Sequence, residues 1–233
     1  MQNSFSKNTI ARIAGLLYLV VVLTGIFSLM YVPKQLIVWD NAMLTFQNIS
    51  ANETLFRLGI VSSLLCYTFF LFLPLALYQL FENTNKNYAQ LMVILAIVSV
   101  PISFLNMQNK YAVLSLISGE KYLDVFSTQE LPTQVLFYLK QYNNGILIVQ
   151  IFWGLWLFPF GYLVFKSGFL PKILGILLML GCFGYLINFA GFSLLRNYAE
   201  LGIASFVRLP ASLGEIGICL WLLVMGVREK KEG

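Results

Sequence analysis

The run IAGLLYLVVVLTGIFSLMYV occupies residues 13–32 and contains no charged side chain. A helix needs about 20 mostly apolar residues to cross the hydrocarbon core of a bilayer. The run is too long for the apolar core of a signal peptide, and no small-residue cleavage pattern closes it. It therefore predicts an uncleaved first membrane helix, and so a helical membrane protein.

The composition of the whole chain also indicates a membrane protein. Of its 233 residues, 59% are hydrophobic and 11% are charged, whereas soluble domains are about 25% charged. The net charge is +5, but the basic residues stand singly between apolar runs and form no patch. Basic cytoplasmic loops explain this charge better than a nucleic-acid partner does, so no nucleic-acid binding is expected.

Further apolar runs predict an all-α, polytopic membrane protein, a bundle of six transmembrane helices in which residues 1–233 form a single domain. Residues 33–54 and 110–130 are too polar to cross the membrane and too apolar to be free linkers, so we expect short interfacial helices there, on the outer face. The predicted spans are about residues 13–32, 55–81, 88–106, 142–165, 170–192 and 203–227, and the fourth has an alternative, earlier start near Thr133.

Basic residues indicate the orientation of these spans. Six helices place both termini on one side of the membrane, and the short turns on that side contain Lys86, Lys166 and Lys172. An excess of Lys and Arg in short loops marks the cytoplasmic side. We therefore expect a multi-pass protein of the bacterial cytoplasmic (inner) membrane with both termini in the cytoplasm.

Glu215 lies inside the last predicted span. A carboxylate in hydrocarbon costs about 2.5–3.5 kcal/mol on insertion scales. Other polar side chains fall near the outer ends of the predicted helices, while the cytoplasmic halves are almost wholly apolar. We therefore expect an outward-facing polar pocket, with these candidate ligand-binding residues: Glu215, Arg57, Arg208, Asn106, Gln150 and Asn188.

Several roles for this pocket remain open. A structural clasp would tie the last helix into the bundle, whereas a binding site would hold a lipid or small amphiphile. A small transporter or channel would use Glu215 as an ion- or proton-linked site, with Pro74 and Pro159 interrupting helices, but the apolar cytoplasmic half argues against an open route. An enzyme is the least favoured class, because the chain has no histidine, no paired carboxylates in its spans and no phosphate-binding loop. No catalytic residue, metal site or cofactor is predicted.

Three segments carry a resemblance to a known family. They are Arg12-Ile-Ala-Gly-Leu-Leu-Tyr-Leu, Leu55-Phe-Arg-Leu-Gly-Ile and, most specific, GLWLFPFGYLVFKSGFLPKILG at residues 154–175. Through them the chain resembles, over nearly its whole length, the bacterial membrane family called domain of unknown function 4386. The resemblance implies an uncharacterised bacterial integral membrane protein with several spans. It implies no activity, cofactor or catalytic residue.

Overall fold

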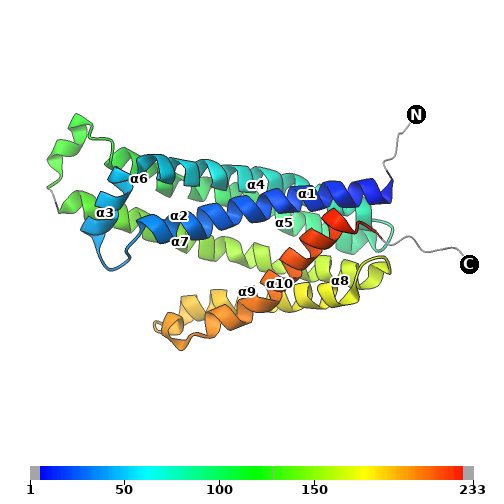
Figure 1. The fold of residues 1–233 in the computed structure, drawn as a ribbon. Helices are drawn as coiled ribbons and strands as arrows, with labels where there is room; N and C mark the ends of the chain where they lie inside the picture. The colour runs from blue at the N-terminus through cyan, green and yellow to red at the C-terminus, as the bar shows by residue number, and fades with distance from the viewer. Residues whose placement is uncertain (1–5, 128, 228–233) are drawn as a thin grey trace, which may run out of the picture. The chain divides into compact units, whose positions relative to one another are not determined.

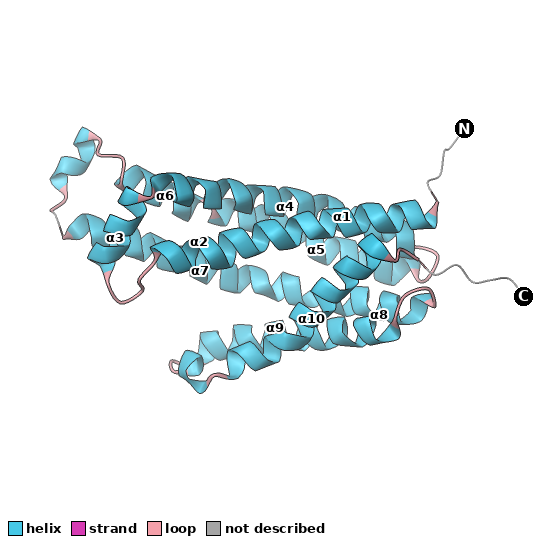
Figure 2. Ribbon diagram, in the orientation of Figure 1, coloured by secondary structure: helices cyan, strands magenta, loops and turns pink. Residues whose placement is uncertain are grey.

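The computed structural model describes residues 6–127 and 129–227, and within these ranges the regular structure is helical, without strands (Figures 1 and 2). The elements follow one another as α1 Lys7–Ile26, the π-helix η1 Phe27–Tyr31, α2 Val32–Leu36, α3 Ala42–Ala51, α4 Glu53–Phe81, α5 Lys86–Asn106, α6 Gln108–Leu116, the 3₁₀-helix η2 Lys121–Val125, α7 Glu130–Leu155, α8 Leu157–Ser167, α9 Lys172–Leu194, the 3₁₀-helix η3 Tyr198–Leu201 and α10 Ile203–Val224.

Six helices or joined helical runs in the described ranges are long and apolar enough to cross a membrane. Each contains a window of at least 18 residues with few charges, which is the length a bilayer requires. The protein is therefore an all-α, multi-pass membrane protein, as its sequence predicted. The six runs are Lys7–Leu36, Glu53–Phe81, Lys86–Leu116, Glu130–Ser167, Lys172–Leu194 and Ile203–Val224.

The fourth span begins at Glu130, close to the alternative start near Thr133 and well before residue 142. The backbone N–H of Ser127 donates to Glu130 Oε2 at 2.7 Å, and the backbone N–H of Glu130 donates to Ser127 Oγ at 3.3 Å. This reciprocal pair is a capping box, which satisfies N–H groups that the first helical turn leaves without partners. The polar residues after it form the first turns of α7 instead of a loop.

The two segments expected to lie on the membrane do contain short helices, but one of these helices belongs to a membrane span. Residues 108–116 form α6, which continues the third span beyond residue 106, and only η2 stands apart from it. Asn41 caps α3 by accepting the backbone N–H of Leu44 at 2.9 Å. The hydroxyl of Thr45 bonds both backbone groups of Val38, each at 2.9 Å, and so fixes the link before α3. The position of these short helices at the outer face of the membrane stays a prediction.

The two prolines considered as helix breakers behave differently. Helix α4 continues through Pro74. Helix α7 ends at Leu155, and α8 starts after a turn at Trp156. Pro159 explains this interruption, because proline has no N–H and its ring clashes with the carbonyl four residues earlier, which here belongs to Leu155.

The chain divides into two compact units. The first unit comprises Met1–Val20, Thr68–Val100 and Ile148–Gly233, and the second comprises Val21–Tyr67 and Pro101–Leu147. Helices α1, α4, α5 and α7 contribute residues to both. Glu215 belongs to the first unit.

Glycines set the close packing of α8, α9 and α10 in the first unit. A Cβ at Gly161 in α8 would lie 2.5 Å from the carbonyl oxygen of Gly175 in α9, and one at Gly181 would lie 2.7 Å from Cα of Ala211 in α10. Distances under 3.0 Å leave no room for a side chain, so these helices meet backbone to backbone. Helices α9 and α10 accordingly run alongside each other in Figure 1.

Candidate functional site around Glu215

The carboxylate of Glu215 accepts hydrogen bonds from two tyrosine hydroxyls. Tyr18 in α1 donates to Oε2 at 3.1 Å, and Tyr185 in α9 donates to Oε1 at 3.3 Å. The side chain of Glu215 is half-buried, and Tyr18 is 1% exposed. A carboxylate within an apolar span therefore has one hydroxyl partner on each oxygen, which offsets part of the cost of removing it from water.

Glycines in α10 and α1 bring the two tyrosines within reach of Glu215. A Cβ at Gly214 would lie 3.1 Å from the backbone nitrogen of Leu178, so α10 packs closely against α9 at this level. About two turns beyond Glu215 on α10, a Cβ at Gly15 in α1 would lie 2.8 Å from Cα of Leu223. Because α10 approaches both helices so closely, hydroxyls from α1 and α9 converge on one carboxylate.

An aromatic cluster holds Tyr18 in place. Its ring centroid lies 6.3 Å from that of Trp156 and 6.5 Å from that of Phe160. Trp156 is 1% exposed and also packs edge-on against Phe70 at 5.2 Å. Since Trp156 forms the turn between α7 and α8, the interruption of the fourth span lies directly against a residue that bonds Glu215.

Arg208 is the cation nearest in sequence to the carboxylate, two turns earlier on α10. Its guanidinium carbon lies 5.9 Å from the centroid of the Tyr185 ring, and its side chain is exposed. Within the described ranges, no ion pair under 4 Å joins Arg208 to Glu215. Tyr185 thus bonds the carboxylate through its hydroxyl and lies near the guanidinium through its ring, while the two charged groups form no direct ion pair.

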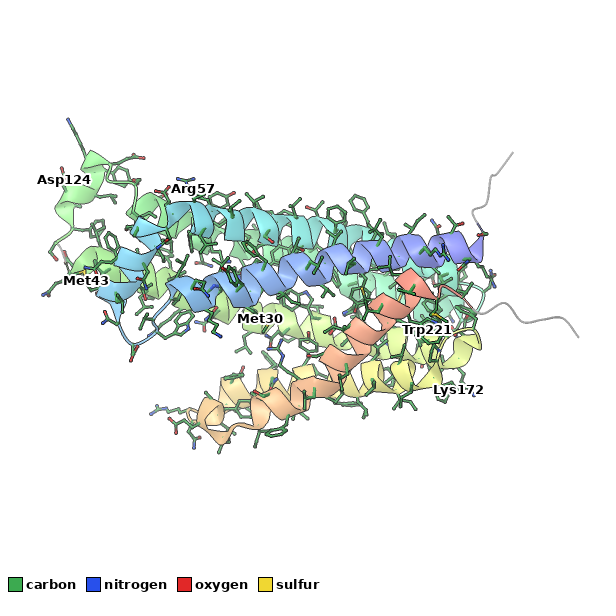
Figure 3. All side chains as sticks on the ribbon, viewed as in Figure 1. Met30, Met43, Arg57, Asp124, Lys172 and Trp221 are labelled. Atoms are coloured by element: carbon green, nitrogen blue, oxygen red, sulfur yellow. The ribbon has the colours of Figure 1, made fainter. Side chains whose placement is uncertain are left out.

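Two of the candidate residues belong to the second unit and have other partners. Arg57 is exposed on α4 (Figure 3), and its Nε donates to Glu53 Oε1 at 2.6 Å. Asn106 is buried, and its amide nitrogen donates to the carbonyl oxygen of Tyr142 at 2.9 Å. The first bond lies within α4, and the second joins α5 to α7 within the second unit.

The other two candidate residues lie in the first unit. Asn188 is 1% exposed, donates to the carbonyl oxygen of Ala204 at 3.1 Å and accepts from the hydroxyl of Tyr198 at 2.8 Å. Its amide therefore ties the turn between α9 and α10 together and does not bond Glu215. Gln150 is half-buried in α7.

Comparisons with known proteins define the family. Residues 13–226 match the family described as "Domain of unknown function (DUF4386)". The chain belongs to this family. A protein of Archaeoglobus fulgidus, described as uncharacterised, is 36% identical over 80 residues, which cover 33% of this chain and 43% of that protein. The match thus spans less than half of this relative's length. No solved structure matches significantly. Because this relative is archaeal, the bacterial origin expected from the resemblance stays a prediction.

The two tyrosines were missed by reasoning from the sequence of this DUF4386 chain. The expected partners were arginines and amides, which look out of place in apolar helices, whereas tyrosine counts among the residues of membrane interfaces. A signal was present, however. A tyrosine in the middle of an apolar run buries a hydroxyl that needs a partner, and Tyr18 lies in such a run.

Proposed function

We propose that this membrane protein binds the polar head group of a lipid or small amphiphile beside Glu215. The observation that carries the proposal is a half-buried carboxylate in a span, bonded by two neutral hydroxyls and without an ion-pair partner under 4 Å in the described ranges. A carboxylate has about four lone-pair positions. Two tyrosine donors therefore leave acceptor capacity for a ligand.

Arg208 gives the site a second charge. Seven positions separate it from Glu215 on α10, about 10 Å along the helix axis, and the long arginine side chain can shorten that separation. Its exposed guanidinium retains donors for a phosphate or carboxylate. Head groups that combine a hydrogen-bond donor with an anionic group complement this pair.

The same helix offers an apolar surface for the rest of an amphiphile. Large aliphatic side chains of α10 are exposed near both charges, where acyl chains would contact them. They are Leu209 (51% exposed), Leu213 (60%), Ile216 (44%) and Leu220 (50%). As part of this proposal, the protein lies in a bacterial cytoplasmic membrane, with both termini in the cytoplasm and the site around Glu215 open to the outer side.

Thermal unfolding of the purified protein in detergent tests this proposal. The probes are phosphatidylethanolamine, phosphatidylglycerol and a glycolipid with matched acyl chains. We expect at least one head group to stabilise the wild type, by about 2.7 kcal/mol at 100 times its Kd, and to lose that effect in Glu215→Gln and Arg208→Gln. The matched controls Glu200→Gln and Arg196→Gln alter exposed charges of the same unit and should retain it. Equal stabilisation of Glu215→Gln, or none of the wild type, would contradict the proposal.

A second candidate function is a small transporter in which Glu215 is a proton-linked site. One observation favours it: the interruption of the fourth span at Trp156 packs against Tyr18, which bonds Glu215. Transporters often build their sites from interrupted helices. Proton flux into dye-loaded proteoliposomes distinguishes the two functions. Flux that depends on the protein and disappears in Glu215→Gln would favour transport, and its absence together with lipid stabilisation would favour binding.

A further inference from the structure

The second unit contains a buried charged residue that the proposed function does not use. Lys110 belongs to α6, within the third run long enough to cross a membrane, and it is only 4% exposed. A buried ammonium group is costly unless a partner compensates its charge. Its surroundings therefore indicate what that partner is.

The neighbouring groups compensate the charge only in part. The ammonium nitrogen lies 4.3 Å from the centroid of the Tyr142 ring, whose face attracts cations weakly. No carboxylate of residues 6–127 or 129–227 lies within 4 Å of it, and the same ranges supply no hydrogen-bond acceptor for its N–H groups. A lysine ammonium has three donors, so this one retains its hydrogen-bonding capacity.

The amides beside Lys110 are already engaged with each other. Asn106 donates to the carbonyl oxygen of Tyr142 at 2.9 Å, and Asn109 donates to the side-chain oxygen of Asn106 at 3.0 Å. The hydroxyls of Tyr67 and Tyr142 lie 3.3 Å apart and bond each other. These bonds fix the Tyr142 ring beside the ammonium group. They do not involve Lys110, whose charge they leave uncompensated.

We propose that Lys110 is the centre of an oxyanion-binding site, which takes a phosphate or carboxylate group. An oxyanion would neutralise the buried charge and accept the ammonium donors, which the ring face does not do. A lipid head group and a free anion share this chemistry. The site is formed within the second unit, so its occupation does not depend on the function proposed for Glu215.

Thermal unfolding with two kinds of probe tests the site. Sodium phosphate is compared with sodium chloride at equal ionic strength and pH, and phosphatidylglycerol nanodiscs are compared with phosphatidylcholine nanodiscs. We expect phosphate or phosphatidylglycerol to raise the Tm of the wild type and of Lys140→Met, an exposed lysine in the same unit, but not that of Lys110→Met. A response to phosphate identifies a free anion, and a response to phosphatidylglycerol alone identifies a head group. No response, or an equal response in Lys110→Met, would overturn the proposal.

Amine labelling of the wild type keeps the test independent of whether Lys110→Met folds. An acylating reagent modifies lysines at rates that mass spectrometry reads residue by residue, with Lys140 as the internal control. At phosphate or phosphatidylglycerol levels about ten times the Kd, the labelling of Lys110 should fall about tenfold, because mass action leaves about a tenth of the sites free. An unchanged ratio of Lys110 to Lys140 labelling with both probes would refute the site.

Discussion

The backbone N–H of Val227 donates a hydrogen bond to Oδ1 of Asn8 at 3.3 Å, across 219 positions of the chain. Asn8 lies in the first turn of α1, and Val227 follows the end of α10. The start of α1 and the end of α10 therefore lie close together. An even number of membrane crossings produces this arrangement, in agreement with the six apolar runs.

This contact and the basic turns lead to a topology prediction. Reporter fusions at Lys86, Lys172 and Gly233 should report the cytoplasm, and a fusion at Asp124 should report the outside (Lys172 and Asp124 are labelled in Figure 3). The physical reason is the retention of Lys and Arg in short loops on the cytoplasmic side. Alkaline phosphatase and fluorescent-protein fusions give opposite signals for the two sides. An external signal at Gly233 would refute this orientation, and together with cytoplasmic signals at Lys86 and Lys172 it would also refute the even number of crossings.

The hydroxyl partners of Glu215 predict a graded loss of stability. Tyr18→Phe should lower the free energy of unfolding by about 1.5–3 kcal/mol, because it removes a hydrogen bond to a carboxylate. Glu215→Ala should cost more than Glu215→Gln, since glutamine retains one oxygen acceptor. Unfolding by SDS titration in mixed micelles measures these values.

A double mutant checks that the two residues act together. Tyr18→Phe combined with Glu215→Ala should destabilise by less than the sum of the single changes, because both remove the same bond. Tyr88→Phe, a tyrosine of the first unit whose ring stacks on Tyr162 at 4.2 Å, serves as the control. Strict additivity for Tyr18 and Glu215 would mean that the hydrogen bond contributes nothing to stability.

The contact of α8 with α9 predicts intolerance of a single methyl group. Gly161→Ala should destabilise by about 1–3 kcal/mol, as overpacking does, because its Cβ would meet the backbone of Gly175 at 2.5 Å. Gly25→Ala is the matched control within a helix, since its Cβ would meet only the Sγ of Cys66 at 3.6 Å. Its effect should be neutral or stabilising, as helix propensity dictates. Thermal unfolding in detergent measures both, and equal Tm values for the two variants would contradict this packing.

The ion pair of Arg57 predicts a small effect. Its side chain and that of Glu53 are 58% and 41% exposed and form an i,i+4 pair on α4. Such pairs are worth about 0.3–0.5 kcal/mol, so Arg57→Gln should change the free energy of unfolding by no more than that. Lipid stabilisation measured in parallel determines whether Arg57 shares the function proposed for Glu215. A stability loss above 2 kcal/mol would show a role beyond this pair.

The sequence alone determined the class of the protein and its spans. Apolar runs of about 20 residues leave few alternatives, because in hydrocarbon the backbone must satisfy its own hydrogen bonds and a helix does so within one segment. The early start of α7 has a local signal, since Ser127 and Glu130 have the spacing of a capping box. The position of Glu215 inside a span was likewise visible without a structure.

Only the tertiary structure decided which groups bond that carboxylate. Tyr18 lies 197 positions away from Glu215 in the chain, and no periodicity relates the two. Their contact depends on which helices are neighbours and how they are rotated, and this depends on where glycines such as Gly15 and Gly214 let backbones approach. The order of apolar and polar residues indicates the length of each helix, whereas the neighbours of a side chain are set by packing between helices that are distant in sequence.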